Sequence, residues 1–163
     1  GEYCNLILSK YPLSDAKTYD LGVIITTVSY PRSLGVVKLT VDGKEFYFAD
    51  THLDHLSDIT NKMHQIEKIK EYTKDLDKPI IMAGDFNAVE GSDPLSSLLE
   101  KFTLGCLNGN CGLTTGTPIP SKAIDFLMYA PAGSITPVAY DVFYDAFTES
   151  DHFPVVATFK VHK

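Results

Sequence analysis

Apolar residues along the chain gather in short runs of strand length, separated by turn residues. Such runs occur at 5–8, 22–28, 36–41, 45–49, 123–129, 138–143 and 154–161. Apolar and polar positions alternate on both sides of Asp42-Gly43, and this pair suits the positive φ angles of a tight hairpin turn. The pattern therefore predicts a chain with more strands than helices and one clear hairpin.

Two segments have the spacing of helices instead. One is expected to begin after Ser57 or Asp58 and to end near Thr73, because its apolar residues recur every three or four positions: Ile59, Met63, Ile66, Ile69 and Tyr72. A second is expected to begin at Ser92-Asp93-Pro94 and to reach Gly105. Between them, the continuous apolar run 79–83 is typical of a strand buried on both faces. This mixture favours a layered α/β sandwich over a helical bundle.

Composition is that of one globular domain spanning residues 1–163, with 44% hydrophobic and 21% charged residues. No apolar run approaches the roughly 20 residues of a membrane helix, so we expect no membrane span and no retained signal peptide. Because 21 Asp and Glu outnumber 14 Lys and Arg, the net charge of −7 disfavours duplex nucleic acid, unless metal ions reverse the field at the site.

The three cysteines allow one disulfide bridge at most. Cys106 and Cys111, in the Gly- and Asn-rich segment 105–112, are close enough in sequence for a short loop bridge, and reduced or buried thiols are the alternative. A bridge would indicate an exported protein, and the sequence otherwise leaves the compartment open.

Four short polar clusters each contain or follow an apolar run: Thr51-His52-Leu53-Asp54-His55, Gly84-Asp85-Phe86-Asn87, Ile124-Asp125-Phe126 and Ser150-Asp151-His152. Strand ends that converge in a sandwich would bring these clusters into one cleft. Carboxylates suit Mg²⁺ or Mn²⁺, which prefer oxygen ligands, and imidazoles suit proton transfer. The combination indicates phosphoryl chemistry, which requires charge neutralisation, an oriented water and a stabilised leaving oxygen.

With Phe153-Pro154 after the last one, these clusters resemble, in order and spacing, the motifs of the endonuclease/exonuclease/phosphatase family. The resemblance covers nearly the whole chain. It implies a four-layer α/β/β/α sandwich of the deoxyribonuclease I-like type and a metal-dependent phosphoesterase that hydrolyses a phosphodiester or a phosphomonoester. Substrate choice in this family resides in loops, which we expect here at 15–20 and 107–121.

The resemblance also implies a role for each matching residue. His152 would lie beside the scissile phosphate with Asp125 as its orienting partner, and Asp85 would activate the attacking water. Phosphoryl oxygens would be contacted by His52 and Asn87. The implied ligands of Mg²⁺ or Mn²⁺ are Asp151, Asp85 and Asn87. Glu2 matches an acid that orients the first imidazole in some members, whereas Asp54 and His55 fit a structural role equally well.

Family members begin with a strand that carries an Asn and a segment that carries a metal-binding Glu, and neither segment is found before Gly1. We therefore expect an N-terminally incomplete domain with a weakened metal site and little or no hydrolysis by the chain alone. An incomplete sandwich would leave apolar faces exposed, so we expect self-association or binding to a partner.

Two alternatives stay open. The chain could be a catalytically incomplete module that binds phosphorylated ligands or a partner without turnover. A zinc hydrolase site at His52 and His55 is disfavoured, because Asn87 is not a zinc ligand type. Among phosphorylated substrates, the acidic charge favours small molecules and lipid headgroups over nucleic acid.

Overall fold

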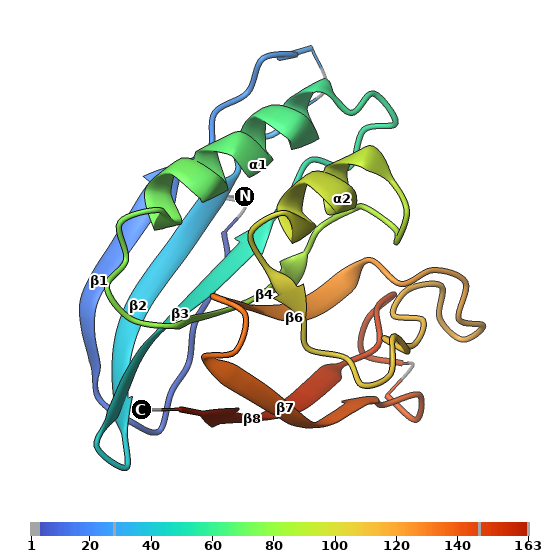
Figure 1. The fold of residues 1–163 in the computed structure, drawn as a ribbon. Helices are drawn as coiled ribbons and strands as arrows, with labels where there is room; N and C mark the ends of the chain where they lie inside the picture. The colour runs from blue at the N-terminus through green and yellow to red at the C-terminus, as the bar shows by residue number, and fades with distance from the viewer. Residues whose placement is uncertain (1–3, 28, 147, 163) are drawn as a thin grey trace.

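Helices and strands stack in three layers in this structure, a computed structural model that describes residues 4–27, 29–146 and 148–162 (Figure 1). Helices α1 (Thr60–Thr73) and α2 (Asp93–Leu99) cover one face of a six-stranded sheet, and a two-stranded sheet lies on the opposite side. The predicted α/β sandwich is therefore confirmed, and the described residues supply the helix, sheet and sheet layers of the four-layer arrangement.

The larger sheet has the strand order β1-β2-β3-β4-β6-β5. Its strands are β1 (Leu13–Asp20), β2 (Ser33–Val41), β3 (Lys44–His52), β4 (Ile80–Asp85), β5 (Thr103–Leu104) and β6 (Asp125–Ala130). Strands β3 and β4 are parallel and are connected through α1, whereas the other neighbours are antiparallel. The ends of β3 and β4 and the start of β6 consequently lie at one edge of the sheet.

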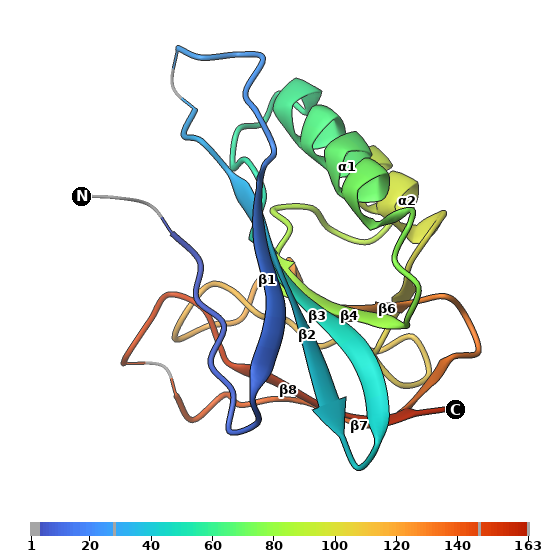
Figure 2. The same cartoon turned by 90° about the vertical axis from the view of Figure 1, so that its left-hand side faces the viewer.

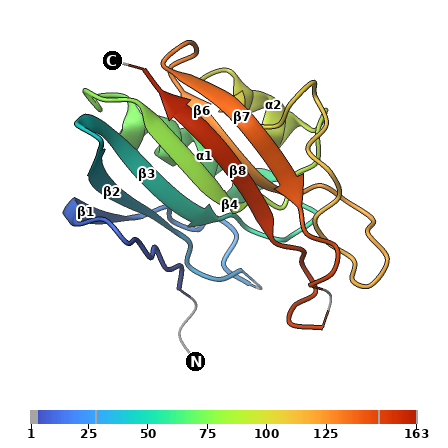
Figure 3. The same ribbon diagram turned by 90° about the horizontal axis from the view of Figure 1, so that it is seen from below.

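The smaller sheet pairs β7 (Ile135–Val142) with β8 (Val155–Val161) in antiparallel register. Seen from below, it crosses the β4 and β6 side of the larger sheet and does not reach β1 and β2 (Figure 3). The apolar contact between the two sheets is formed by Ile81, Tyr129, Ile135 and Val161. A larger core lies between the helices and the six-stranded sheet, where Ile66 and Ile69 of α1 pack with Leu95 and Leu98 of α2.

Helix α1 matches the predicted helix in length but not in every contact. It ends at Thr73 as expected, and its Ile66 and Ile69 are buried, whereas Met63 is only half-buried. Ile59 precedes the first turn without a side-chain cap, although Asp58 Oδ1 accepts a hydrogen bond from the Thr60 amide at 2.8 Å. The second helix begins as predicted but ends at Leu99, well before Gly105.

Two predicted strands are wrong. Residues 5–8 form no strand, and Leu6 and Leu8 are 74% and 83% exposed. Residues 22–27 form a loop, and Val28 lies outside the described residues. The loop is fixed by a side chain rather than by a strand ladder, because Asn61 Oδ1 accepts hydrogen bonds from the amides of Ile24 and Ile25 at 2.9 and 2.8 Å.

The segment 15–20, expected to be a substrate loop, is instead part of the edge strand β1, while 107–121 is a loop as expected. Strand β1 lies at the edge of the sheet (Figure 2). The hydrophobic pattern did not indicate this strand, because its residues are exposed along nearly its whole length. Its partner β2 continues into the hairpin at Asp42-Gly43, whose φ angles of 50° and 73° confirm the predicted turn.

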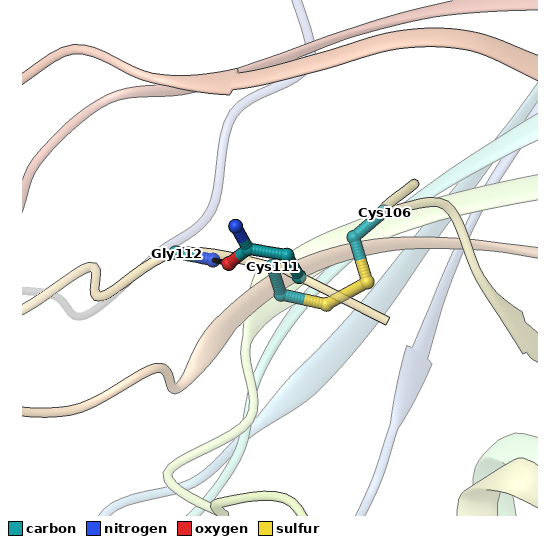
Figure 4. The surroundings of a disulfide bond; sticks show 4 residues. Cys106, Cys111 and Gly112 are labelled. Carbon is teal, nitrogen blue, oxygen red and sulfur yellow. Dashed lines mark hydrogen bonds between the residues drawn. A yellow bond between two sulfur atoms is a disulfide. The ribbon is translucent and has the colours of Figure 1, made fainter. Parts of the chain in front are cut away.

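Cys106 and Cys111 form a disulfide bridge, which is one of the two alternatives that the sequence left open (Figure 4). It closes a short loop between β5 and the segment that leads to β6, and Cys4 is free and exposed. Among the described residues, no helix has both the length and the apolar content needed to cross a membrane.

Candidate active site

Three polar residues lie side by side where β3, β4 and β6 meet. His52 ends β3, Asp85 ends β4 and Asp125 begins β6, and the strand register pairs Asp85 with each of the other two. Directly paired residues present their side chains on the same sheet face, about 5 Å apart. Gly84 permits this close approach, because a Cβ at that position would lie 2.2 Å from the carbonyl oxygen of Thr51.

Asp125 and His152 form a hydrogen-bonded pair. His152 lies in the loop before β8, and its Nδ1 is 2.8 Å from Asp125 Oδ2, within the reach that an orienting pair requires. Its Nε2 lies 4.0 Å from Asp85 Oδ2. Burial alone would lower the pKa of His152, but the hydrogen bond and the charge of Asp125 outweigh burial and raise this pKa.

Asp85 lies between two imidazoles. Its Oδ2 is 3.3 Å from His52 Nε2, and its Oδ1 accepts a hydrogen bond from the amide of Asn87 at 2.8 Å. Burial is the largest influence on both partners, raising the pKa of Asp85 and lowering that of His52 against their mutual attraction. Both shifts favour uncharged forms, so a water-activating role for Asp85 would begin from a carboxylate that holds a proton more readily than an exposed one.

Asn87 is held in an unusual backbone conformation beside Asp85. Its φ of 45° lies in the left-handed region, which Asn tolerates better than most residues. Its Nδ2 donates to the carbonyl oxygen of Leu53 at 3.1 Å, which leaves the amide oxygen for a cation. Phe86, between the two polar residues, is fully buried in the core as expected.

A cavity of about 550 Å³ contains all of these groups. Its lining residues are Tyr30, Arg32, His52, His55, Asp85, Asn87, Asp125, Asp151 and His152. The structure therefore confirms the prediction that the four polar clusters lie around one cleft. Glu2, expected to orient His52, lies outside the described residues.

Asp54 and His55 differ in their surroundings. Asp54 is fully buried and accepts hydrogen bonds from Asn61 Nδ2 at 2.6 Å, from the Leu56 amide at 3.0 Å and from the Ser29 hydroxyl. Burial would raise the pKa of Asp54, but these hydrogen bonds outweigh it and lower the pKa. Asp54 thus anchors loops, whereas His55 lines the cavity.

Tyr30 and Arg32 also line the cavity and were missed in the sequence. Arg32 is 4% exposed, and Tyr30 is 54% exposed. The two-residue hairpin turn fixes the register of β2 and β3, in which Leu34 pairs with Thr51. The residues just before β2 therefore lie beside the end of β3. Because this register follows from the predicted hairpin turn, Tyr30 and Arg32 could have been predicted to lie near His52.

The donor set fits a hard divalent cation. Ligand atoms of Asp85, Asp125 and His152 lie within 4.8 Å of one another among the described residues. Burial and, after it, the charge of Asp125 raise the pKa of Asp85, and a cation would relieve the repulsion between the two carboxylates. Asp125 Oδ2, however, is already hydrogen-bonded to His152. Asn87 and the exposed Asp151 line the same cavity as Asp85, and both carry oxygen donors of the kind that hard cations prefer.

Fold and site together define a two-sheet α/β sandwich with a carboxylate and imidazole cavity at its strand ends. Residues 1–152 match the model of the endonuclease/exonuclease/phosphatase family. The chain belongs to this family. A comparison with curated protein sequences gave no match.

Solved structures share this fold at low sequence identity. The endonuclease/exonuclease/phosphatase from Bacteroides vulgatus superposes with a TM-score of 0.79 at 21% identity, over 94% of this chain and 67% of that one. Mannosyl-6-phosphatase Bt3783 from Bacteroides thetaiotaomicron gives 0.74 at 21% identity, over 93% and 67%. D. rerio TDP2, complexed with a single-strand DNA product, gives 0.72 at 17% identity, over 91% and 68%. The chain thus spans about two thirds of the length of these structures.

Proposed function

We propose that the protein is a metal-dependent phosphoric ester hydrolase whose reaction takes place in the cavity at the ends of β3 and β4. The observation that carries this proposal is the convergence of His52, Asp85 and Asp125 in one strand register with His152 hydrogen-bonded to Asp125. Family membership supports the reaction class.

Asp85 is assigned to orient the attacking water and accept its proton, because burial raises its pKa and the Asn87 amide fixes its Oδ1. His152 donates through Nδ1 to Asp125, which directs its Nε2 into the cavity toward the phosphoryl group. His52 and the second Nδ2 proton of Asn87 donate to phosphoryl oxygens, where charge develops in the transition state. Arg32 adds positive charge to the cavity wall.

Mg²⁺ or Mn²⁺ is proposed to be held by Asp85, Asn87 and Asp151. When bound, such a cation would neutralise phosphoryl charge. The three proposed ligands all offer oxygen atoms, which favours these hard cations over zinc.

Small phosphorylated molecules or lipid headgroups are proposed as the substrates. The net charge of −7 opposes long polyanions, and the cavity volume lies in the range of small-molecule sites. Sugar phosphate chemistry is indicated by the name of the Bacteroides thetaiotaomicron relative, whereas the TDP2 complex represents the nucleic-acid alternative. The bridge between Cys106 and Cys111 supports an oxidising compartment.

The experiment compares wild-type protein with Asp85→Asn and with Asp141→Asn, which changes an exposed carboxylate on β7. After chelation, hydrolysis of bis-p-nitrophenyl phosphate and p-nitrophenyl phosphate is measured with Mg²⁺, Mn²⁺ or Zn²⁺, and Mn²⁺ binding is measured by calorimetry. Because the metal site is expected to be weakened, we expect slow turnover with Mg²⁺ or Mn²⁺, which should fall by about 10²- to 10⁴-fold in Asp85→Asn and persist in Asp141→Asn.

Each other outcome selects an alternative. Binding of Mn²⁺ and inorganic phosphate without any turnover would support the non-catalytic module. Turnover with Zn²⁺ alone would support the zinc site, and turnover unaffected by Asp85→Asn would exclude this mechanism.

A further inference from the structure

Thr114 is a fully buried polar residue behind the active-site cavity. It lies three residues after Cys111, in the loop that leads to β6, and it does not line the cavity itself. Its hydroxyl group makes three hydrogen bonds: to Asp125 Oδ2 at 2.6 Å and with the amides of Ile124 and Asp125, each at 3.1 Å.

The direction of these bonds follows from the chemistry of the groups. A hydroxyl has one proton to donate and two lone pairs with which to accept. Backbone amides can only donate, so the amides of Ile124 and Asp125 occupy both lone pairs. The single hydroxyl proton is therefore directed at Asp125 Oδ2, and the bonding capacity of Thr114 is fully used.

Asp125 Oδ2 consequently accepts from two donors, Thr114 Oγ1 and His152 Nδ1. The first bond fixes the carboxylate, and the fixed carboxylate in turn fixes the tautomer and orientation of the imidazole. Such hydrogen bonds to charged acceptors are stronger than bonds between neutral groups.

The backbone of Thr114 holds the other member of the pair. Its carbonyl oxygen accepts from the amide of Phe153, the residue after His152, at 2.7 Å. Thr115, the next residue, forms an isolated bridge with His152. One residue therefore ties down Asp125 through its side chain and the His152 segment through its main chain.

We propose that Thr114 is a positioning residue for phosphoester hydrolysis, which holds the Asp125 carboxylate so that His152 presents Nε2 to the substrate. This role rests on the proposed function of the cavity. The hydroxyl group acts through Asp125 and not on the substrate, so its loss should lower kcat more than it changes KM.

Three variants test this role. Thr114→Val removes the hydroxyl with little change in shape, and Thr114→Ser keeps it. Thr73→Val is the matched control, because Thr73 is also buried and its hydroxyl donates to the carbonyl oxygen of Ile69 at 2.7 Å, at the end of α1. Thermal melting gives the folded fraction of each variant, and kcat and KM are measured with bis-p-nitrophenyl phosphate and Mn²⁺.

For Thr114→Val we expect kcat per folded molecule to fall by about 10- to 100-fold, with KM changed by less than about threefold. Thr114→Ser should retain kcat within about threefold of wild type, and Thr73→Val should lose stability without losing kcat. Equal kcat in Thr114→Val and wild type, or a Ser variant no better than the Val variant, would overturn the proposal.

A second readout needs no turnover. The proton on His152 Nδ1 should give a slowly exchanging nuclear magnetic resonance signal in wild type and Thr114→Ser, and a rapidly exchanging or absent one in Thr114→Val. An unchanged signal in the Val variant would overturn the proposal. A wild-type protein without turnover would contradict the proposed function, while this signal would still decide the role of Thr114.

If the Val variant does not fold, solvent exchange of the Thr114 hydroxyl proton is measured in the wild-type protein instead. A buried hydroxyl proton committed to Asp125 should be protected from solvent exchange, and its observation supports the proposal. Rapid exchange would overturn it.

Discussion

Asp50 is a half-buried acid outside the active site. It lies on β3 two residues before His52, and with Asn5, Ile7 and Gly35 it lines a small cavity under the N-terminal segment. Burial raises the pKa of this carboxyl to about 6. The folded protein therefore binds this proton more tightly than the unfolded chain does, and the contribution of Asp50 to stability falls as pH rises from about 4 to about 6.

Asp50→Asn should remove the free-energy cost of holding an ionised carboxylate in this half-buried position. The pKa difference corresponds to at most about 3 kcal/mol, and partial solvent access reduces the expected effect to about 1–2 kcal/mol. Asp50→Asn should thus raise the free energy of unfolding at pH 8 and leave it nearly unchanged at pH 4, as measured by urea denaturation. The exposed Asp75→Asn serves as the control. A variant less stable than wild type at pH 8 would show that Asp50 stabilises the fold as a carboxylate.

Sequence motifs located the cavity residues better than they located the residues that support them. His52, Asp85 and Asp125 could be predicted because each follows or starts an apolar strand. Thr114 lies in a Gly- and Thr-rich loop without periodicity, and its contact with Asp125 depends on a loop path that no local pattern encodes.

Helices and strands with a strong hydrophobic periodicity were predicted correctly. Segments whose structure depends on contacts with distant residues were not. Helix α1 and the hairpin of β2 and β3 follow directly from local patterns. Strand β1 is exposed on both faces, so it lacks the alternation that marks a half-buried strand, and it is defined by its pairing with β2. Residues 22–27 are apolar enough for a strand, but the side chain of Asn61 replaces the ladder partner.

The disulfide bridge between Cys106 and Cys111 should stabilise the fold, and this effect can be measured. A bridge that closes a loop of this length should stabilise the fold by about 2 kcal/mol in the chain-entropy model. The double change Cys106→Ser with Cys111→Ser should therefore lower the melting temperature by about 4–8 °C. Dithiothreitol should lower the melting temperature of wild type and of Cys4→Ser by the same amount and leave the double variant unchanged. A wild type insensitive to dithiothreitol would contradict a stabilising bridge.

In the molecule as a whole, the helical layer lies on one side of the large sheet (Figure 1), and the small sheet covers the other side in part (Figure 3). Apolar side chains that stay exposed include Leu6, Leu8, Val138 and Val156. Self-association through such surfaces stays a prediction. The layered class could be predicted from the sequence, whereas the extent of coverage depends on contacts between segments far apart in the chain.

The central claim is that the cavity at the strand ends hydrolyses phosphoric esters with His152 beside the phosphate. The most direct test is single-turnover hydrolysis of a fluorescent phosphodiester by excess protein with Mn²⁺, because these conditions detect slow reactions. The variants are His152→Ala and the control His162→Ala, which removes an exposed imidazole hydrogen-bonded to Thr136. We predict a rate lower by about 10²- to 10⁴-fold in His152→Ala, with its melting temperature nearly unchanged, and no loss in His162→Ala. Equal rates in His152→Ala and wild type would contradict the account, and the absence of hydrolysis by wild type under these conditions would support the non-catalytic module instead.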